Sequence, residues 1–354
     1  MTDAGTLEAL LSHVADKPAA MARLAHVLLT KGRGDHAREL CHRAMAMAPE
    51  DAEVHALAVA VFSYGVADWY FPMVRDRARH AAYETAMRRA IKPGCRVLEI
   101  GTGTGLLAMM AARAGAAEVV TCEGDPAVAE VAREIIVRNG FGDCVRVVAK
   151  SSRDLEVGVD LDQRADVLVW DALSNNMIGA GALPTMEHAM RQLMRPGACA
   201  VPSAGVIRIA LAEDRRADNR RMDTVEGFDL SAFNRLAAPS YQIPVGDNRL
   251  ILRSEPADLF RFAFQSGGPF PEARANVRLV SSGGLVNGVV QWVSFQMDDQ
   301  VRYENEPAVG TNSAFAALFY PLMRAVETEP GHGLAVCGSH DRLSLRIWAE
   351  TPLS

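Results

Sequence analysis

Three glycines and one glutamate form the pattern in this sequence that is best suited to chemistry. Gly101, Gly103 and Gly105 lie in a GxGxG turn that also contains Thr102, and Glu123 follows about 20 residues later. Glycine permits tight or positive-φ backbone geometry and lets a ligand approach main-chain N–H groups closely. An acidic side chain at this spacing can accept hydrogen bonds from both ribose hydroxyls of a nucleoside. The pattern therefore predicts a nucleoside-binding site.

The segments around the turn indicate a parallel α/β sheet. The apolar run from Arg96 to Ile100 stops at the first glycine and predicts a buried parallel strand. Leu106 to Ala114 is rich in the helix formers Leu, Met and Ala, and Gly115 ends it. Glu118 to Cys122 predicts a second strand, and Cys144 to Ala149 predicts a further one.

The spacing within the turn helps to choose the ligand. Nicotinamide, flavin and adenosylmethionine enzymes all use glycine turns, so the turn alone is weakly diagnostic. Here the spacing is GxGxG rather than GxGxxG, and the second strand ends in Glu-Gly-Asp-Pro. This combination favours S-adenosylmethionine over a dinucleotide. The alternative is a βαβ turn that binds no ligand.

Composition bounds the class of protein. The 354 residues are enough for two or three domains. The net charge of -6 and the pI near 5.9 argue against a nucleic-acid partner, which usually requires a basic face. The six cysteines are scattered without a CxxC pair, so we expect reduced thiols, a cytoplasmic location and no metal site. No stretch approaches the length of a membrane span, and the N-terminus lacks the pattern of a signal peptide.

Residues 1–65 are expected to form a helical segment. Apolar stripes at helical spacing recur around Leu10, Leu28 and Leu40, and Pro49 starts another helix. The small residues and the proline fall where a tetratricopeptide-like helical pair would place them. Because only one repeat is visible and repeats need neighbours for stability, a peptide-docking groove and a helical cap on the catalytic domain both remain open.

Residues 68–92 are expected to supply a lid. Tyr83, Ala86 and Met87 belong to an apolar stripe at helical spacing, and a cluster of arginines that includes Arg79 precedes most of it. A helix that precedes the first strand of the sheet could fold over the ligand.

The second half of the chain predicts a β-rich domain. The insert around Phe228 to Gln242 is expected to act as an arm, because its apolar residues need a partner surface to cover them. Strands are expected at Cys199–Val201, Val206–Leu211, Arg249–Leu252, Leu259–Phe264, Ala275–Val280, Val286–Phe295 and Leu343–Ala349.

Together these segments resemble the protein arginine methyltransferase family, and most of all its type III branch. VLEIGTGTGLLAMMAARAGA is similar to the family's first motif, and NGFGDCVRVVAKSS (139–152) to its segment leading to the adenine site. MIGAGALPTMEHAMRQL (177–193) is similar to the branch's segment after the substrate loop, and VEGFDLSAFN (225–234) to the start of the dimerisation arm. The resemblance covers roughly residues 68 to 350. It implies a Rossmann-type class I methyltransferase sheet followed by a β-barrel domain, S-adenosylmethionine as the cofactor, and a homodimer.

The expected domains follow from this resemblance. A tetratricopeptide-like helical segment covers residues 1–65, and the cofactor-binding α/β domain with its lid helix covers 66–202. The β-barrel domain covers 203–354 and contains the arm-like insert at about 215–248.

The resemblance also implies roles for individual residues. Arg79 matches the lid arginine that pairs with the methionine carboxylate of the cofactor, and Met73 matches the lid methionine near its sulfonium. Glu123 falls at the ribose position, and Ser152 with Arg153 falls at the adenine edge. The implied cofactor-binding set is Met73, Arg79, Gly101, Thr102, Gly103, Gly105, Glu123, Ser152 and Arg153.

The sequence departs from the family where the target guanidinium is held. The family uses two glutamates on one loop, because two carboxylates fix the planar cation by paired hydrogen bonds. Here Asp171, which ends the fourth strand, takes the first position and Ala180 takes the second. Glu187, Glu304 and Glu306 are the candidates for the missing acid.

A second departure lies in a loop of the barrel. The family usually carries a histidine there that pairs with an aspartate of the lid, which is Asp76 in this chain. The corresponding residue is Asn312, which could still hydrogen-bond Asp76 but without charge.

We therefore expect methyl transfer from S-adenosylmethionine with Asp171, Asp76 and Asn312 at the catalytic centre. The expected acceptor is a guanidino nitrogen of arginine, in a protein or a small molecule. The alternatives are another N, O or S nucleophile of a small metabolite, and a non-catalytic scaffold that binds the cofactor.

Overall fold

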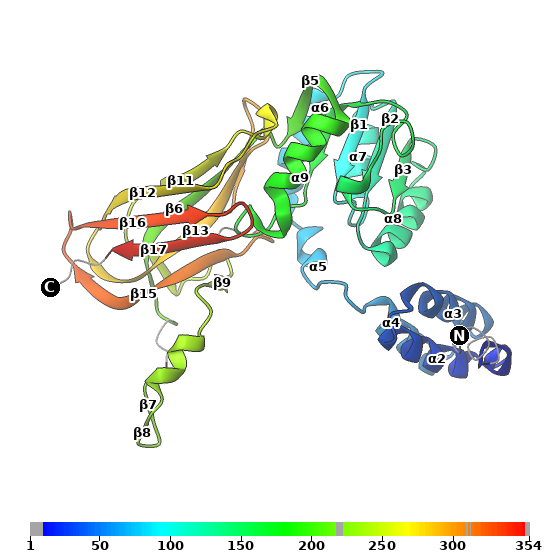
Figure 1. Ribbon diagram of the computed structural model, residues 1–354, viewed down its shortest axis with the longest axis horizontal. Coiled ribbons are helices and arrows are strands. Elements are labelled where there is room, and N and C mark those ends of the chain that lie inside the picture. Colours follow the sequence, from blue (N-terminus) through cyan, green and yellow to red (C-terminus); the bar gives the residue numbers. More distant parts are fainter. Residues whose placement is uncertain (1–9, 217–221, 309–310, 312, 351–354) are drawn as a thin grey trace. The chain divides into compact units, whose positions relative to one another are not determined.

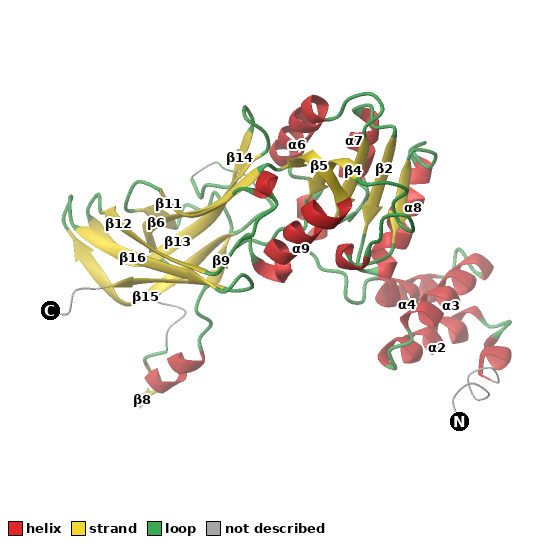
Figure 2. Cartoon of the chain, turned by 45° about the horizontal axis from the view of Figure 1, so that its top comes forward, coloured by secondary structure: helices red, strands yellow, loops and turns green. Residues whose placement is uncertain are grey.

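The chain divides into two units, Met1–Tyr70 and Phe71–Ser354. The structure is a computed structural model that describes residues 10–216, 222–308, 311 and 313–350. Figure 1 colours the chain along the sequence and Figure 2 colours it by secondary structure. Within the described ranges, no helix combines the length and the apolar character that crossing a membrane requires.

The first unit packs three successive helices around a small apolar core. They are α2 (Pro18–Thr30), α3 (Gly34–Met47) and α4 (Ala52–Phe62). Leu28 and Leu40, from two of the predicted stripes, are buried in this core. Asp51 caps α4 by accepting hydrogen bonds from the backbone N–H groups of Glu53 and Val54.

A five-stranded parallel sheet begins the second unit. Its strand order is β3-β2-β1-β4-β5, so the chain reverses its direction of winding beside β1. The strands are β1 (Arg96–Ile100), β2 (Glu118–Cys122), β3 (Val145–Val148), β4 (Ala165–Trp170) and β5 (Met194–Val201). The first two have the predicted bounds, because a short apolar run bounded by glycine is a local signal.

Helices flank this sheet as the αβ alternation requires. The flanking helices are α6 (Arg77–Ala90), α7 (Leu106–Arg113), α8 (Pro126–Arg138) and α9 (Ala182–His188), which continues into η3 (Ala189–Leu193), and the short α5 (Tyr70–Met73) precedes them in the chain. The predicted lid helix is α6, and its buried face carries Tyr83, Ala86 and Met87. In an open parallel sheet, ligands bind outside the carboxyl ends of the strands where the winding reverses, which here is between β1 and β4.

The change from parallel to antiparallel pairing falls between β5 and β6, at Pro202 and Ser203. A seven-stranded sheet and a three-stranded sheet then form a barrel-like domain (Figure 1). The larger sheet contains β6 (Ala204–Asp214), β9 (Tyr241–Ile243), β10 (Leu250–Leu252), β11 (Ala257–Phe262), β13 (Gly284–Gln296), β14 (Arg302–Glu304) and β15 (Ala317–Thr328). The smaller contains β12 (Ala273–Val280), β16 (Gly333–His340) and β17 (Leu345–Glu350). One apolar core runs from the parallel sheet into the barrel-like domain.

The sequence analysis missed four of these strands, β9, β14, β15 and β16. β15 contains Pro321, and a proline within a run argues against a strand because it cannot donate to the ladder. The structure accommodates it at an irregularity, because the register between β13 and β15 shifts between Val286 and Gly288 and Pro321 then lies opposite Gly288. β16 contains Gly333 and Gly338, which interrupt the β-branched pattern that predicts strands.

The arm lies within the predicted insert. It consists of the short hairpin β7 (Thr224–Val225) and β8 (Phe228–Asp229), followed by η5 (Ser231–Leu236). It stands away from the barrel strands in Figure 1, and its apolar side chains Phe228, Phe233 and Leu236 are exposed. The part of the insert at 217–221 lies outside the described residues.

A glycine in β13 tests the packing of the barrel core. A Cβ at Gly288 would lie 2.1 Å from Cζ of Phe319, whose buried ring covers this position. We expect Gly288→Ala to lower the free energy of unfolding by about 1–3 kcal/mol, as overpacking does. Chemical denaturation would measure the loss, and Gly124→Ala is the control because a Cβ there meets nothing within 4 Å. Equal stability of the two variants would contradict the packing argument.

Candidate active site

The carboxyl ends of β1 and β4 bring the glycine turn and Asp171 to one place. The backbone N–H of Asp171 donates to the carbonyl of Ile100 at 3.3 Å, so the two strand ends stay in contact. A Cβ on Gly101 would lie 3.5 Å from the backbone nitrogen of Ala172. The sheet therefore presents the turn and the aspartate to the same crevice.

The glycine turn wraps around the carboxylate of Glu123. Gly103 N–H donates to Glu123 Oε2 at 3.1 Å, and Asp125 N–H donates to Oε1 at 3.1 Å. Gly105 has φ +78°, a backbone conformation that favours glycine, and a Cβ there would lie 2.9 Å from the Ile136 side chain. Both the backbone conformation and the lack of room for a side chain therefore require glycine. Glu123 is thus fixed at the end of β2, where a ribose would need it.

A buried carboxyl that the sequence analysis missed lies behind this turn. Glu99, on β1, is 1% exposed and accepts a hydrogen bond from Thr121 Oγ1. Burial raises the pKa of Glu99 to about 8, and the nearby carboxylates of Asp171 and Glu123 act in the same direction. Glu99 is therefore a neutral acid at pH 7, which limits the negative charge in the crevice.

Thr102 belongs to this buried network. Its Oγ1 lies 2.7 Å from Thr121 Oγ1, and the residue is 3% exposed. The side chain thus faces the interior, where it bonds the Thr121 hydroxyl that in turn donates to Glu99, and only its backbone belongs to the turn surface.

The lid arginine and the strand-end aspartate bind one another. Arg79 Nη1 donates to both carboxylate oxygens of Asp171, and the two side chains are 2% and 8% exposed. Tyr83 Oη donates to the carbonyl of Trp170 at 2.7 Å and lies 3.3 Å from Asp171 Oδ1. Burial alone would lower the pKa of Arg79, but Asp171 and its neighbours hold it above the ordinary value. The pair is a charge-assisted contact shielded from water.

Met73 and His80 complete the surroundings of Arg79. Arg79 Nη2 donates to the carbonyl of Met73 at 3.3 Å and lies 3.3 Å from His80 Nε2. Because a guanidinium only donates, His80 Nε2 accepts, and its imidazole is neutral. Burial and then the charge of Arg79 lower the pKa of His80, which agrees with this state. The sequence analysis did not single out His80.

Asp76 is joined to the barrel by partners other than the predicted one. Its Oδ2 accepts from Tyr303 Oη at 2.7 Å and from the backbone N–H of Ala314 at 3.1 Å. The predicted partner Asn312 lies outside the described residues. Tyr303 was missed because 227 residues separate it from Asp76, and local sequence carries no signal for such a contact.

The loop after Asp171 uses most of its polar side chains on itself. Ser174 Oγ and Asn176 Oδ1 both accept from Gly179 N–H, at 3.0 and 2.9 Å. Gln291 Nε2 of β13 donates to the carbonyl of Asn175 at 3.1 Å and ties the loop to the barrel. Ala180 lies in η2 (Gly179–Gly181) within this loop.

Two of the candidates for a second acid have other partners. Glu187 accepts from Phe270 N–H at 2.7 Å and pairs with Arg342. Glu304 accepts from Trp292 Nε1 at 2.7 Å and pairs with Arg208 at 3.3 Å. Among the described residues, neither side chain bonds Asp171 or its loop, and their partners give both a structural role.

The two residues predicted at the adenine edge lie in η1 (Ser152–Asp154). Ser152 is buried, whereas Arg153 is exposed. The guanidinium of Arg153 reaches Gly181, where a Cβ would lie 3.1 Å from its Nη2. Arg153 therefore lies against the start of α9, and its role toward adenine stays a prediction.

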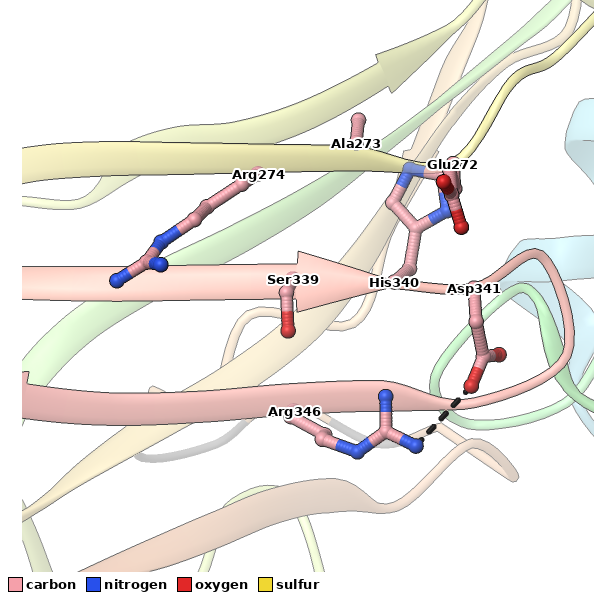
Figure 3. Close-up of a pocket in the computed structure, with 7 residues that line it drawn as sticks. All are labelled: Glu272, Ala273, Arg274, Ser339, His340, Asp341 and Arg346. Carbon is pink, nitrogen blue, oxygen red and sulfur yellow. Dashed lines mark hydrogen bonds and ion pairs between the residues drawn. The ribbon is translucent and has the colours of Figure 1, made fainter.

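An open hollow lies elsewhere, on the barrel-like domain (Figure 3). Its volume is about 390 Å³, and it is lined from β12, β16, β17 and the ends of these strands. Asp341 and Arg346 at its edge pair with each other at 3.0 Å. It is separate from the crevice at β1 and β4, because none of its lining residues belongs to the parallel sheet or the lid.

Comparisons with known proteins agree with this arrangement. A family model described as "Ribosomal protein L11 methyltransferase (PrmA)" matches residues 83–213, and a "Tetratricopeptide repeat" model matches residues 4–60. The chain is 32% identical over 308 residues to an "Arginine N(omega)-methyltransferase" of Streptomyces achromogenes subsp. streptozoticus, which covers 86% of this chain and 84% of that protein. It is 31% identical over 256 residues to "Protein arginine N-methyltransferase 7" of Drosophila grimshawi, which covers 64% of this chain but only 35% of that protein.

A solved structure shares the fold. The chain matches the "Trypanosoma brucei PRMT1 enzyme-prozyme heterotetrameric complex with AdoHcy" with a TM-score of 0.70 at 22% identity, over 82% of this chain and 96% of that one. The predicted fold class, with its tetratricopeptide-like segment, is confirmed. S-adenosylmethionine is likewise confirmed as the cofactor.

The residues of the crevice fit this cofactor. Glu123 offers carboxylate oxygens for a ribose, and the glycine turn exposes backbone rather than side chains. Arg79 Nε is buried and, among the described residues, has no hydrogen-bond partner, so a carboxylate beside it would satisfy this donor. The individual roles within this set remain predictions.

Replacement of Glu123 tests the ribose assignment. We expect Glu123→Gln to weaken S-adenosylhomocysteine binding about tenfold or more, because hydrogen bonds to a charged group are worth about 1.5–3 kcal/mol. Calorimetric titration would measure Kd, with Glu134→Gln as the control because Glu134 pairs with Arg138 on the exposed face of α8. An affinity within about twofold of wild type would contradict the assignment.

Glu99 predicts a pH dependence of stability. Between its ordinary pKa of 4.5 and its folded pKa of about 8, the unfolded chain releases a proton that the folded chain keeps. The contribution of Glu99 to stability therefore falls as pH rises through this window, and Glu99→Gln removes this contribution because an amide does not titrate. Denaturation across the window should show the variant gaining stability relative to wild type as pH rises, and the difference should level off above it. A difference independent of pH would contradict the shifted pKa.

Proposed function

The chain belongs to the arginine N-methyltransferase family, and from this premise we propose that it transfers a methyl group from S-adenosylmethionine to an ω-nitrogen of arginine. The observation that carries the proposal is the Asp171 carboxylate, which already binds a guanidinium with both of its oxygens. A carboxylate recognises the planar, delocalised guanidinium better than any neutral group does.

The chain's own residues would act by holding and orienting. Bound S-adenosylmethionine supplies a methyl group on a sulfonium, which is already activated for transfer. Asp171 would orient the guanidino group so that one nitrogen faces this methyl, and proximity would supply much of the rate. Arg79 would bind the methionine carboxylate and Glu123 the ribose, while the lid helix α6 would exclude water from the crevice.

We place free arginine ahead of arginine within a protein. The chain covers 84% of the relative called an arginine N(omega)-methyltransferase. It covers only 35% of the Drosophila grimshawi relative, which is called a protein arginine N-methyltransferase. The tetratricopeptide-like segment supports the peptide alternative, since such repeats can dock peptides.

The substrate test compares acceptors directly. Labelled S-adenosylmethionine would be offered with free arginine, an arginine-rich peptide and a metabolite extract, and products would be identified by mass spectrometry. Label on free arginine supports the proposal. Label only on the peptide would move the substrate to protein arginine, and label only in the extract would indicate another nucleophile and overturn arginine as the substrate.

Asp171 should be essential to that reaction. We expect Asp171→Asn to lower kcat/KM for arginine by about a hundredfold or more, because losing one partner of a buried charge pair costs about 2–5 kcal/mol. Asp166→Asn is the matched control, since Asp166 lies on β4, the strand that Asp171 follows, and bonds Arg96 N–H at 2.7 Å and Arg195 at 2.7 Å. Equal activity of the two variants would contradict the role of Asp171.

We also propose that the chain forms a homodimer through its arm. Phe228, Phe233 and Leu236 expose 70%, 61% and 77% of their surface on a segment that stands away from the barrel strands. Several large apolar side chains exposed on one short segment are typical of a protein–protein interface. Cytoplasmic location is part of the same proposal, supported by six unpaired cysteine thiols.

A single charged residue introduced into the arm tests whether the protein forms a dimer. We expect Leu236→Asp to halve the mass measured by light scattering, because burying an unpaired carboxylate opposes association. Met323→Asp is the control, since Met323 is exposed on β15 outside the arm. A monomeric wild-type protein, or an unchanged mass in Leu236→Asp, would contradict an arm-mediated dimer.

A further inference from the structure

The lid helix α6 is tied to the barrel-like domain at both of its ends. At its start, Asp76 bonds Tyr303 and Ala314, and near its end Arg89 pairs with Asp298 at 3.0 Å. The two ties differ in burial, because Asp76 and Tyr303 are 7% and 5% exposed whereas the side chain of Arg89 is 43% exposed. The tie at the start is therefore the one protected from water.

One carboxylate oxygen of Asp76 bonds the lid helix α6, and the other bonds the barrel-like domain. Oδ1 accepts from the backbone N–H of Arg79 at 3.0 Å and thereby caps the first turn of α6. Oδ2 accepts from Tyr303 Oη and Ala314 N–H of the barrel. The carboxylate thus joins the backbone of the residue that binds Asp171 to a hydroxyl of the barrel.

Tyr303 is held firmly on the barrel side. It lies on β14, and its ring packs 6.5 Å from those of Phe295 and Phe315, measured between ring centroids. Its hydroxyl lies beside Ser313 Oγ as well as Asp76. Packing of the ring and hydrogen bonding of the hydroxyl together restrict where the phenol lies. Because Asp76 bonds this hydroxyl, the position of Asp76 and of the start of α6 is restricted as well.

We propose that Tyr303 is a positioning residue for methyl transfer: through Asp76 it sets the first turn of α6 and so places the Arg79 guanidinium for the cofactor. The inference rests on the proposed role of Arg79 toward the methionine carboxylate. It does not depend on arginine being the acceptor, because the placement concerns the cofactor alone.

The chemistry of a phenol suits this role. Burial raises the pKa of Tyr303, and the hydrogen bond to Asp76 acts in the same direction. The hydroxyl therefore remains a donor throughout the neutral range, where an imidazole would gain or lose a proton. The link between lid and barrel keeps one charge state while the reaction proceeds.

Binding of S-adenosylhomocysteine to Tyr303→Phe tests the proposal, because phenylalanine keeps the ring and removes only the hydroxyl. We expect Kd to rise about tenfold, the loss expected for one hydrogen bond to a charged group. Arg89→Gln, which breaks the tie at the other end of the same helix, should leave Kd within about twofold of wild type. Tyr320→Phe, at an equally buried tyrosine of β15, should do the same.

A double-mutant cycle with Asp76→Asn separates positioning from general loosening. If Tyr303 acts through Asp76, Tyr303→Phe should raise Kd little further in the Asp76→Asn background. An unchanged Kd in Tyr303→Phe, an equal rise in Arg89→Gln, or additive effects in the cycle would each overturn the proposal. If Tyr303→Phe does not fold, Asp76→Asn compared with Arg89→Gln decides by the same criterion. Failure of wild type to methylate arginine would overturn the proposed substrate and leave this result standing.

Discussion

A buried guanidinium is the constraint on which the arrangement of this site depends. The Arg79 side chain is 2% exposed, and an unpaired charge at that depth would cost several kcal/mol. Asp171 supplies the compensating charge, so the end of β4 must lie against the lid helix. Tyr83, one turn further along α6, bonds the carbonyl of Trp170 and holds that strand end in register with the helix. The lid and the sheet are thus joined at the residues that would meet the cofactor.

The parallel sheet and the barrel-like domain contribute different kinds of polar group to the site. The parallel sheet contributes carboxyl groups at its strand ends, and burial keeps Glu99 neutral, so that Glu123 and Asp171 carry the negative charge of the crevice. The barrel contributes neutral donors, namely the hydroxyl of Tyr303 and the N–H of Ala314. These neutral donors satisfy Asp76 Oδ2 without adding a positive charge that would compete with Arg79 for Asp171.

Sequence patterns predicted the parts of this site that depend on neighbours along the chain. β1, β2 and the glycine turn follow from a short apolar run, its glycine boundary and an acid at fixed spacing, and the structure has both strands at the predicted bounds. The neutral state of Glu99 could not be predicted, because it depends on burial by residues distant in sequence. The Asp76–Tyr303 bond joins residues 227 apart, and only the fold brings them together. β15 was hidden by Pro321, whose missing donor is tolerated because the register shifts beside Gly288.

The proposed recognition of a guanidinium by one carboxylate, where the resemblance implies two, would rely on the loop after Asp171. Ser174 and Asn176 are engaged in the loop's own hydrogen bonds, and Gln291 fixes the loop from the barrel through the carbonyl of Asn175. Among the described side chains of the loop, only Asp171 carries a formal charge. Any ion pair between this loop and a cationic substrate would therefore involve Asp171. The loop backbone, which Gln291 and the internal hydrogen bonds hold in place, would set the shape of the crevice. Selectivity for a guanidinium would then come from one ion pair combined with a preorganised loop, whose rigidity offsets part of the missing charge.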